Sequence, residues 1–166
     1  MTDVIIRPSA QSDLASVDAL LARSYPALLK GDYAPSVLVA ALPMISRARP
    51  ELVTSGSYYV AERGGAVLGA GGWTRHAPTG GVTPRLGHVR HVVTDHRAVR
   101  QGIGRVLMTH VLGCARDAGM ARLECWSTLT AVPFYASLGF EVAAEISVPI
   151  GPARLPFPSV QMVTAL

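Results

Sequence analysis

The turn at residues 97–105 is the part of this sequence whose residue types most clearly suggest chemistry. Gly102 and Gly104 stand at the start of a run whose apolar residues recur at helical spacing, and Gly119 is placed to end that helix. The first N–H groups of a helix have no partner inside it, and the helix dipole adds partial positive charge there. Glycine removes side chains that would block a close approach, and the turn also carries Arg97, Arg100 and Arg105. Together these features predict a phosphate-binding site.

Two familiar phosphate motifs are excluded by the residues that follow the turn. A dinucleotide fingerprint needs a third glycine, and Leu107 stands in its place. A P-loop needs Gly-Lys-Ser or Gly-Lys-Thr, which does not follow here. A nucleotide-binding oxidoreductase is therefore disfavoured.

A second informative stretch, over 131–140, reads Ala-Val-Pro-Phe-Tyr-Ala-Ser-Leu-Gly-Phe. Paired with the Arg-Gln-Gly-Ile-Gly-Arg turn of 100–105, it resembles the GNAT superfamily of acyl-CoA N-acyltransferases. At the level of motifs the resemblance covers about residues 85–142, and the N-terminal part agrees in its pattern of elements. The resemblance implies transfer of an acetyl group from acetyl-CoA, as cosubstrate, to a primary amine by direct attack and with no metal.

The resemblance also implies a role for each matching position. The cosubstrate's pyrophosphate is expected on the turn, at Arg100, Gln101, Gly102, Ile103, Gly104 and Arg105. The pantetheine arm is expected to pair with the strand end at Val92, Val93 and Thr94, whose amides can polarise the thioester carbonyl. Tyr135 is expected to protonate the departing thiolate, or else to hydrogen-bond the cofactor sulfur or pack.

The general base is not assigned by the resemblance. Many members carry a glutamate on the strand before the turn, and Gly87 stands at the comparable position. The candidates nearby are His88, His91 and Glu124, with a water relay as the fourth. The two histidines are three apart on a strand and are expected to face opposite sides, so at most one points into the cleft. Glu124 is equally suited to a structural ion pair.

Other chemically interesting residues are expected to be structural. Cys125 has no identifiable activating base and is expected to be a small buried hydrophobe. His110 is expected to be structural or exposed. Four aromatic residues could line an acceptor pocket, although core packing is the default for most of them: Tyr25, Tyr33, Trp73 and Trp126.

Composition limits the class of protein. The chain is 49% hydrophobic and 16% charged, which favours an ordered globular domain over a disordered chain. Its net charge is +4, but Lys30 is the only lysine and the arginines are scattered outside 97–105, which favours local anion binding over a nucleic-acid surface. The two cysteines suit a reducing cytoplasm, and no signal peptide or membrane span is evident.

The expected elements predict a single α/β (α+β) domain over 1–166, with a mixed, mostly antiparallel sheet of about seven strands flanked by about four helices. The expected strands are Val4–Arg7, Ser57–Arg63, Ala66–Arg75, Arg85–Val93, Arg122–Trp126, Phe140–Val148 and Ser159–Thr164. A first helix is expected to fade at Tyr25-Pro26, and a second, Ser36–Ala48, to kink at Pro43. A connection is expected over Glu51–Gly56 and a loop over Pro149–Pro158.

The acceptor is left open by the sequence. It is expected to depend on the first two helices, on their loop near Gly31–Pro35 and on the loops near 76–84 and 149–158, which carry no motif. Polyamines, aminoglycosides, amino acids and protein N-termini all fit, so the partner is a small-molecule or peptide amine, and a homodimer is also open. A non-catalytic acyl-CoA-binding or regulatory module is the alternative, and the missing glutamate at Gly87 is its best support.

Overall fold

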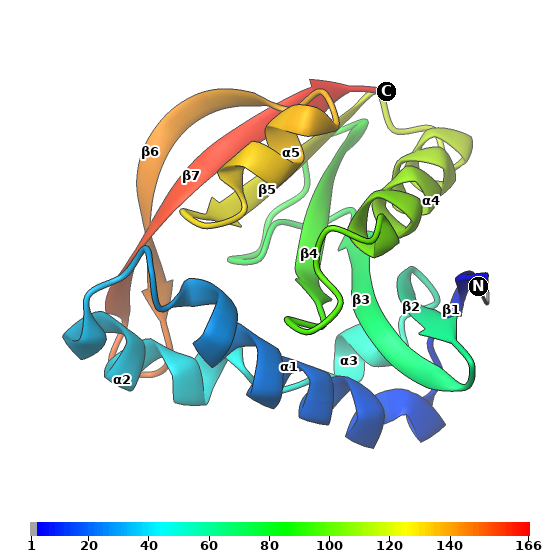
Figure 1. Cartoon of the computed structure of the whole chain (residues 1–166). Coiled ribbons are helices and arrows are strands. Elements are labelled where there is room, and N and C mark those ends of the chain that lie inside the picture. Colours follow the sequence, from blue (N-terminus) through cyan, green and yellow to red (C-terminus); the bar gives the residue numbers. More distant parts are fainter. Residues whose placement is uncertain (1–2) are drawn as a thin grey trace.

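One sheet holds all seven strands of residues 3–166, the part of the chain that the computed structural model describes. The strands are β1 Ile5–Pro8, β2 Tyr58–Arg63, β3 Ala66–Thr74, β4 Leu86–Thr94, β5 Arg122–Thr128, β6 Glu141–Ile150 and β7 Leu155–Ala165. They lie in the order β1-β2-β3-β4-β5-β7-β6 (Figure 1). All neighbours pair antiparallel except β4 and β5, which are parallel. The predicted mixed, mostly antiparallel sheet in an α/β fold is confirmed.

Helices cover both faces of the sheet. They are α1 Leu14–Leu29, α2 Pro35–Ile45, α3 Pro50–Val53, α4 Ile103–Asp117 and α5 Val132–Ser137. In Figure 1, α1 and α2 run along the lower side, whereas α4 and α5 lie above. The sequence predicts about four helices, and the additional one within 3–166 is the short α3, which Pro50 starts at its first position. No helix in this part of the chain is long and apolar enough to cross a membrane.

The alternation of side chains along the strands divides the core between the two faces. Tyr58 is buried with Leu20 and other residues of α1, whereas Tyr59 is buried with Leu107 and other residues of α4. Consecutive strand residues point to opposite faces, so β2 contributes one tyrosine to each layer. The sheet is therefore packed on both sides, and its central strands are held firmly in place.

The parallel pair is short, and this creates the opening on which the site depends. β4 pairs with β5 only from Leu86–His88 to Arg122–Glu124. Beyond that point β4 stays with β3 as far as Thr94, while β5 stays with β7 as far as Thr128. The two strands therefore diverge towards their C-terminal ends.

The prediction that the first helix ends near Tyr25-Pro26 is wrong, because α1 continues through Pro26 to Leu29. A proline inside a helix removes one backbone hydrogen bond and crowds the preceding turn. Tyr25 and Leu29 are buried on either side of it, with 9% and 2% of their surface exposed. Burial of these two side chains offsets the local cost of the proline.

The predicted loop over Pro149–Pro158 is also wrong for most of its length. β6 and β7 form a long hairpin whose pairing runs to Ile150 and Leu155. β7 pairs with β5 only from Ser159 onward, so Pro156 and Pro158 lie where β7 has β6 as its one neighbouring strand. Proline is tolerated there because its missing N–H is not needed for hydrogen bonds to a second strand. The hairpin brings residues of its tip to the divergent ends of β4 and β5.

Candidate active site

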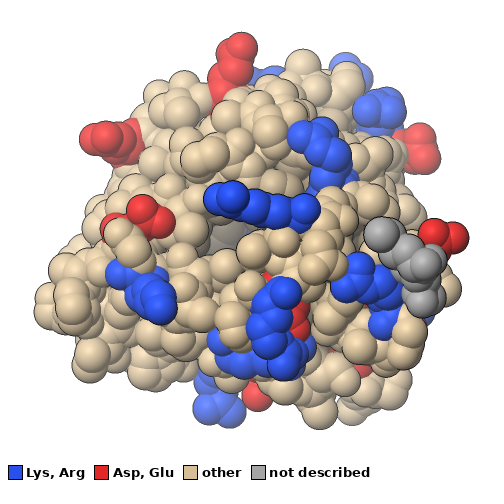
Figure 2. Space-filling view, viewed as in Figure 1, with Lys and Arg blue, Asp and Glu red and all other residues tan. Residues whose placement is uncertain are grey.

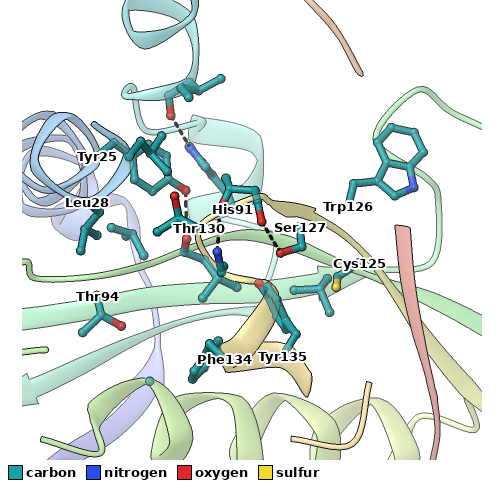
Figure 3. A pocket seen from close by; sticks show the side chains of 18 of the residues that line it. Tyr25, Leu28, His91, Thr94, Cys125, Trp126, Ser127, Thr130, Phe134 and Tyr135 are labelled. Carbon is teal, nitrogen blue, oxygen red and sulfur yellow. Dashed lines mark hydrogen bonds between the residues drawn. The ribbon is translucent and has the colours of Figure 1, made fainter. Parts of the chain in front are cut away.

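A cavity of about 870 Å³ lies where β4 and β5 diverge. Its walls come from α1, α2, α3, β4, the start of α4, β5, α5 and the β6–β7 hairpin. Figure 3 shows Tyr25 and His91 on one side of it and Phe134 and Tyr135 on the other. Val92–Thr94 line the cavity, and no described strand pairs with them on the β5 side. This strand edge can therefore hydrogen-bond an extended ligand in the manner of an added strand.

The two glycines of the turn are needed for different reasons. Gly102 precedes α4 with φ +80°, in the left-handed region, and a Cβ there would meet nothing within 4 Å. A Cβ on Gly104 would lie 3.0 Å from Cε1 of Phe134 and 3.2 Å from Oγ1 of Thr94. From the sequence, the two glycines indicate only that a phosphate has room to approach the turn. The structure adds that Gly102 sets the turn's backbone and that Gly104 lets α4 pack against α5.

Asp95 anchors the turn, and sequence reasoning missed it. Its carboxylate accepts hydrogen bonds from the backbone N–H of Arg97 at 2.9 Å and from the guanidinium groups of Arg97 and Arg23 at 3.0 Å. These bonds hold the pKa of Asp95 well below its ordinary range. An Asp bonding the backbone two residues on is a recognised turn device, so Asp95 could have been found from its spacing. The charge of Arg97, expected to help bind the phosphate, is already paired.

The charged side chains that line the cavity are basic. They are Arg49, Arg90, Arg100 and Arg105, and no Asp or Glu is among the described lining residues. Figure 2 shows Lys and Arg side chains gathered around a hollow in this face. Arg105 also donates to the carbonyl and hydroxyl of Ser137, whereas Gln101 lies outside the lining and accepts a hydrogen bond from Arg63. The cavity therefore favours anions at the mouth beside α4.

Tyr135 reaches the cavity from α5 and is held by aromatic packing. Its ring meets those of Phe134 and Phe140 edge-on, each at 5.3 Å between centroids. Burial raises the pKa of its phenol well above the ordinary value, so the hydroxyl stays protonated at neutral pH. Cys125, which also lines the cavity, is 3% exposed, and burial raises the pKa of its thiol too. The tyrosine can therefore donate a proton, and the thiol has little nucleophilic character.

β4 carries a bulge beside the cavity. Its register with β3 shifts between Ala70 and Gly72, so that His91 and Val92 together oppose the single residue Gly71. Two phenols on the α1 side stabilise this bulge. The phenol of Tyr58 donates a hydrogen bond to the carbonyl of His91 at 2.7 Å. The phenol of Tyr25 donates one to the carbonyl of Val92 at 2.9 Å (Figure 3). The two tyrosines therefore position backbone that lines the cavity.

The bulge overturns the prediction that His88 and His91 face opposite sides of the sheet. His91 adopts φ +49°, and its ring packs near that of Tyr25 on the α1 side. His88 points to the same side, since its neighbour Val89 belongs to the core beneath α4. Strict alternation holds only in a regular strand, and nothing in the sequence marks the bulge.

Of the candidate bases, only His91 lines the cavity. Its Nε2 donates to the carbonyl of Ile45 at 2.8 Å, which leaves Nδ1 as the acceptor, and burial lowers its pKa to about 4. His88 and Glu124 lie outside the described lining, with His88 Nδ1 4.0 Å from a Glu124 carboxylate oxygen. That oxygen accepts a hydrogen bond from Trp126 at 2.7 Å, and burial lowers the pKa of His88.

The aromatic residues divide between the cavity and the core. Tyr25 and Trp126 line the cavity, whereas Trp73 packs beneath α4 and Tyr33 stacks on Phe157 at 4.6 Å. His110, on α4, lies 3.4 Å from the Sγ of Cys114, away from the cavity. Tyr25 also belongs to the core cluster on the α1 side, so the expectation that most of the aromatics pack in the core holds for three of the four.

Comparison with known proteins gives a family for this arrangement. The acetyltransferase (GNAT) domain family matches residues 54–142, whereas no curated protein sequence matches the chain. A GCN5-related N-acetyltransferase from Rhodopseudomonas palustris has a similar structure, with a TM-score of 0.77 at 17% identity over 100% of this chain and 98% of its own.

Two further solved structures share the fold. The PaiA N-acetyltransferase from Thermoplasma acidophilum, in complex with coenzyme A, has a TM-score of 0.73 at 11% identity over 99% of each chain. The ribosomal-protein-S18-alanine N-acetyltransferase from Escherichia coli has a TM-score of 0.65 at 16% identity, over 98% of this chain and 94% of its own.

Proposed function

This chain belongs to the acetyltransferase (GNAT) domain family and is an acetyltransferase, and we propose that it moves the acetyl group of acetyl-CoA directly to a primary amine. The observation that carries the proposal is the continuity of the cavity, which joins the start of α4, the open edge of β4 and the phenol of Tyr135. A direct transfer needs both reactants in one space, held at reacting distance.

The start of α4 is the proposed site of the pyrophosphate. The amides of the first helical turn have no partner in the helix, and Gly102 at φ +80° directs the backbone into it. The proposed contacts are Arg100, Gln101, Gly102, Ile103, Gly104 and Arg105, of which Gln101 is the only one outside the cavity lining. The pantetheine arm would then follow the open edge of β4 at Val92–Thr94. The coenzyme A complex of the Thermoplasma acidophilum protein, which shares the fold, supports acetyl-CoA as the cosubstrate.

Tyr135 is the proposed general acid. The amine nitrogen attacks the thioester carbonyl carbon, the new C–N bond forms, and the C–S bond breaks. The phenol gives its proton to the departing thiolate, which leaves as the free thiol of coenzyme A. The raised pKa of Tyr135 keeps that proton available at neutral pH.

His91 is proposed to orient the amine rather than to act as a strong base. Its Nδ1 can accept an amine N–H, because Nε2 is committed to the carbonyl of Ile45. A pKa of about 4 keeps the ring neutral at pH 7 and makes it a poor acceptor of a full proton. The amine's proton is proposed to pass to water at the mouth of the cavity. This water relay needs no further side chain as a base.

A coenzyme A-release assay with a panel of amines tests this function. Calorimetry with acetyl-CoA should give binding, and at least one primary amine in a panel of amino acids, polyamines, aminoglycosides and short peptides should release coenzyme A. Mass spectrometry of the product should find the amine heavier by one acetyl group. Acetyl-CoA binding without turnover of any amine would contradict the proposal.

A further inference from the structure

The cavity has a second group of basic side chains, separate from the turn. Arg90 lies on β4 just before the bulge and Arg49 lies at the start of α3, and both line the cavity. Arg90 and Thr94 are four residues apart on the strand, which places Arg90 on the order of 10 Å from the end of β4 where the turn begins. These two arginines therefore belong to the end of the cavity that faces away from the proposed pyrophosphate.

Neither guanidinium group is neutralised by the protein. Arg90 donates to the hydroxyl of Thr74 at 3.1 Å, and no carboxylate of the described residues lies within ion-pair distance of it or of Arg49. Glu51 acts on Arg90 only from farther away, and burial together with Arg49 lowers the pKa of Arg90. A half-buried guanidinium that feels the charge of a second one in the same cavity is costly unless an anion is bound there.

The surroundings of this pair are apolar. Arg49 stands between Ile45 and Leu52 in the chain, and both of these line the cavity. The α1-side core contributes Leu29 and Phe157 to the same wall, and the hairpin contributes Val148 and Ile150. A ligand here meets two positive charges within a mostly hydrocarbon wall. A polycation would find no described carboxylate in the cavity lining to balance its charges.

We infer that the acceptor is a primary amine that also carries a carboxylate and an apolar side chain, as an apolar amino acid does, with its carboxylate held between Arg49 and Arg90. The inference rests on the proposed acetyl transfer and narrows its substrate. Paired guanidinium groups suit a carboxylate because their N–H donors match its two oxygens. The amine of the same molecule then lies towards His91, the residue next to Arg90 and on the same face of the sheet.

Three matched acceptors and four variants test the inference. The acceptors are L-leucine, L-leucinamide and 3-methylbutylamine, which share a side chain and differ in the carboxylate. The variants are Arg90→Met, Arg90→Lys, Arg49→Met and, as a control that removes the same charge from an exposed position outside the cavity, Arg122→Met. Each variant is compared with the wild type on the same acceptor, so that differences in amine reactivity cancel.

The expected result is a selective loss. Arg90→Met and Arg49→Met should each lower kcat/KM for leucine by about 10- to 100-fold, the value of a charged hydrogen bond. They should change kcat/KM for 3-methylbutylamine less than about threefold, and the affinity for acetyl-CoA should not change. The kcat/KM of Arg90→Lys for leucine should lie between those of the wild type and Arg90→Met, because lysine keeps the charge and loses the paired N–H donors. Arg122→Met should match the wild type on every acceptor.

Other outcomes distinguish a failure of the proposed acceptor from a failure of the proposed acetyl transfer. Equal losses for leucine and for 3-methylbutylamine, or a wild-type preference for a polyamine over every carboxylate, would overturn the inference and leave the acetyl transfer standing. Arg49 is exposed, so Arg49→Met decides the question even if Arg90→Met fails to fold. Turnover of no amine at all, with acetyl-CoA bound, would instead overturn the proposed function.

Discussion

The two ends of the cavity are built in different ways. At the proposed coenzyme A end, beside α4, a ligand would meet mostly backbone: the open edge of β4 and the first turn of the helix that follows Gly102. At the proposed acceptor end it would meet side chains, above all those of Arg49, Arg90 and His91. The first kind of site is made by one continuous stretch of sequence, whereas the second is assembled from α1, α2, α3, β4 and the β6–β7 hairpin.

This difference predicts which substitutions each end of the cavity tolerates. Only substitution by proline removes a backbone N–H, so the α4 end depends on few side-chain identities. The opposite end depends on which side chains several separate elements carry. Substitutions at the two ends should therefore change different quantities, which the following experiments measure.

Tyr135→Phe should give the largest effect, because Tyr135 is the proposed general acid of the chemical step. Removing the proton donor should lower kcat by about 100-fold or more while changing the affinity for acetyl-CoA little. Steady-state kinetics and calorimetry on the same preparation measure both quantities. Tyr33→Phe is the matched control, since Tyr33 bonds the carbonyl of Pro158 outside the cavity lining and should retain kcat. A Tyr135→Phe enzyme with wild-type turnover would remove the phenol from the acid role.

Gly104→Glu should be the strongest change at the α4 end. A carboxylate about 5 Å from the pyrophosphate costs about 3 kcal/mol at an effective dielectric of 20, or about 100-fold in acetyl-CoA affinity. The new side chain must also displace Phe134, whose ring would lie 3.0 Å from the Cβ. Gly113→Glu on the same helix is the control, because a Cβ there meets nothing within 4 Å and Gly113 lies outside the cavity lining. Equal affinities in calorimetry would move the pyrophosphate away from α4.

The same contrast explains what could be predicted from the sequence. The turn and Tyr135 are recognisable because each belongs to a short local pattern, and the helix after Gly102 follows from apolar spacing. The seven strands follow from runs of apolar residues and turn signals such as Gly64-Gly65, whose φ angles of +59° and +80° suit a tight hairpin.

What could not be predicted depends on tertiary contacts. The β4 bulge is stabilised by the phenols of Tyr25 and Tyr58, which lie more than thirty residues from it in the chain. Without the bulge, the faces of His88 and His91 are assigned wrongly. Likewise, Arg49 and Arg90 are single arginines in unrelated segments, and only the tertiary fold brings both to the lining of one cavity.

His91→Gln should change how stability depends on pH. It therefore tests whether His91, at the end of the cavity away from α4, is buried as a neutral ring. The folded-state pKa of His91 is about 4, against 6.5 in the unfolded chain, so the unfolded state binds more protons between these values. The free energy of unfolding should therefore rise with pH across this window, with about 3 kcal/mol attributable to His91. Glutamine can keep the hydrogen bond to Ile45 but does not titrate.

Urea unfolding of both proteins from pH 4 to pH 7 measures this contribution. The wild type should gain about 3 kcal/mol more than His91→Gln over that range. Asp95 does not interfere, because its lowered pKa makes its contribution disappear only below about pH 4. Parallel curves for the two proteins would mean that His91 is not buried as a neutral ring.

Gly102→Ala should give the smallest effect and isolates the backbone at the α4 end. Gly102 and Gly113 both have open space where a Cβ would stand, so neither alanine clashes. Gly102 has φ +80°, and alanine there should cost about 1–2 kcal/mol of stability, whereas alanine at Gly113, inside α4, should add about 0.5–1 kcal/mol. Thermal unfolding should therefore shift in opposite directions for the two variants. Because strain at Gly102 also disturbs the first-turn amides, only Gly102→Ala should weaken acetyl-CoA binding. Two equal shifts would mean that the left-handed backbone at position 102 does not require glycine.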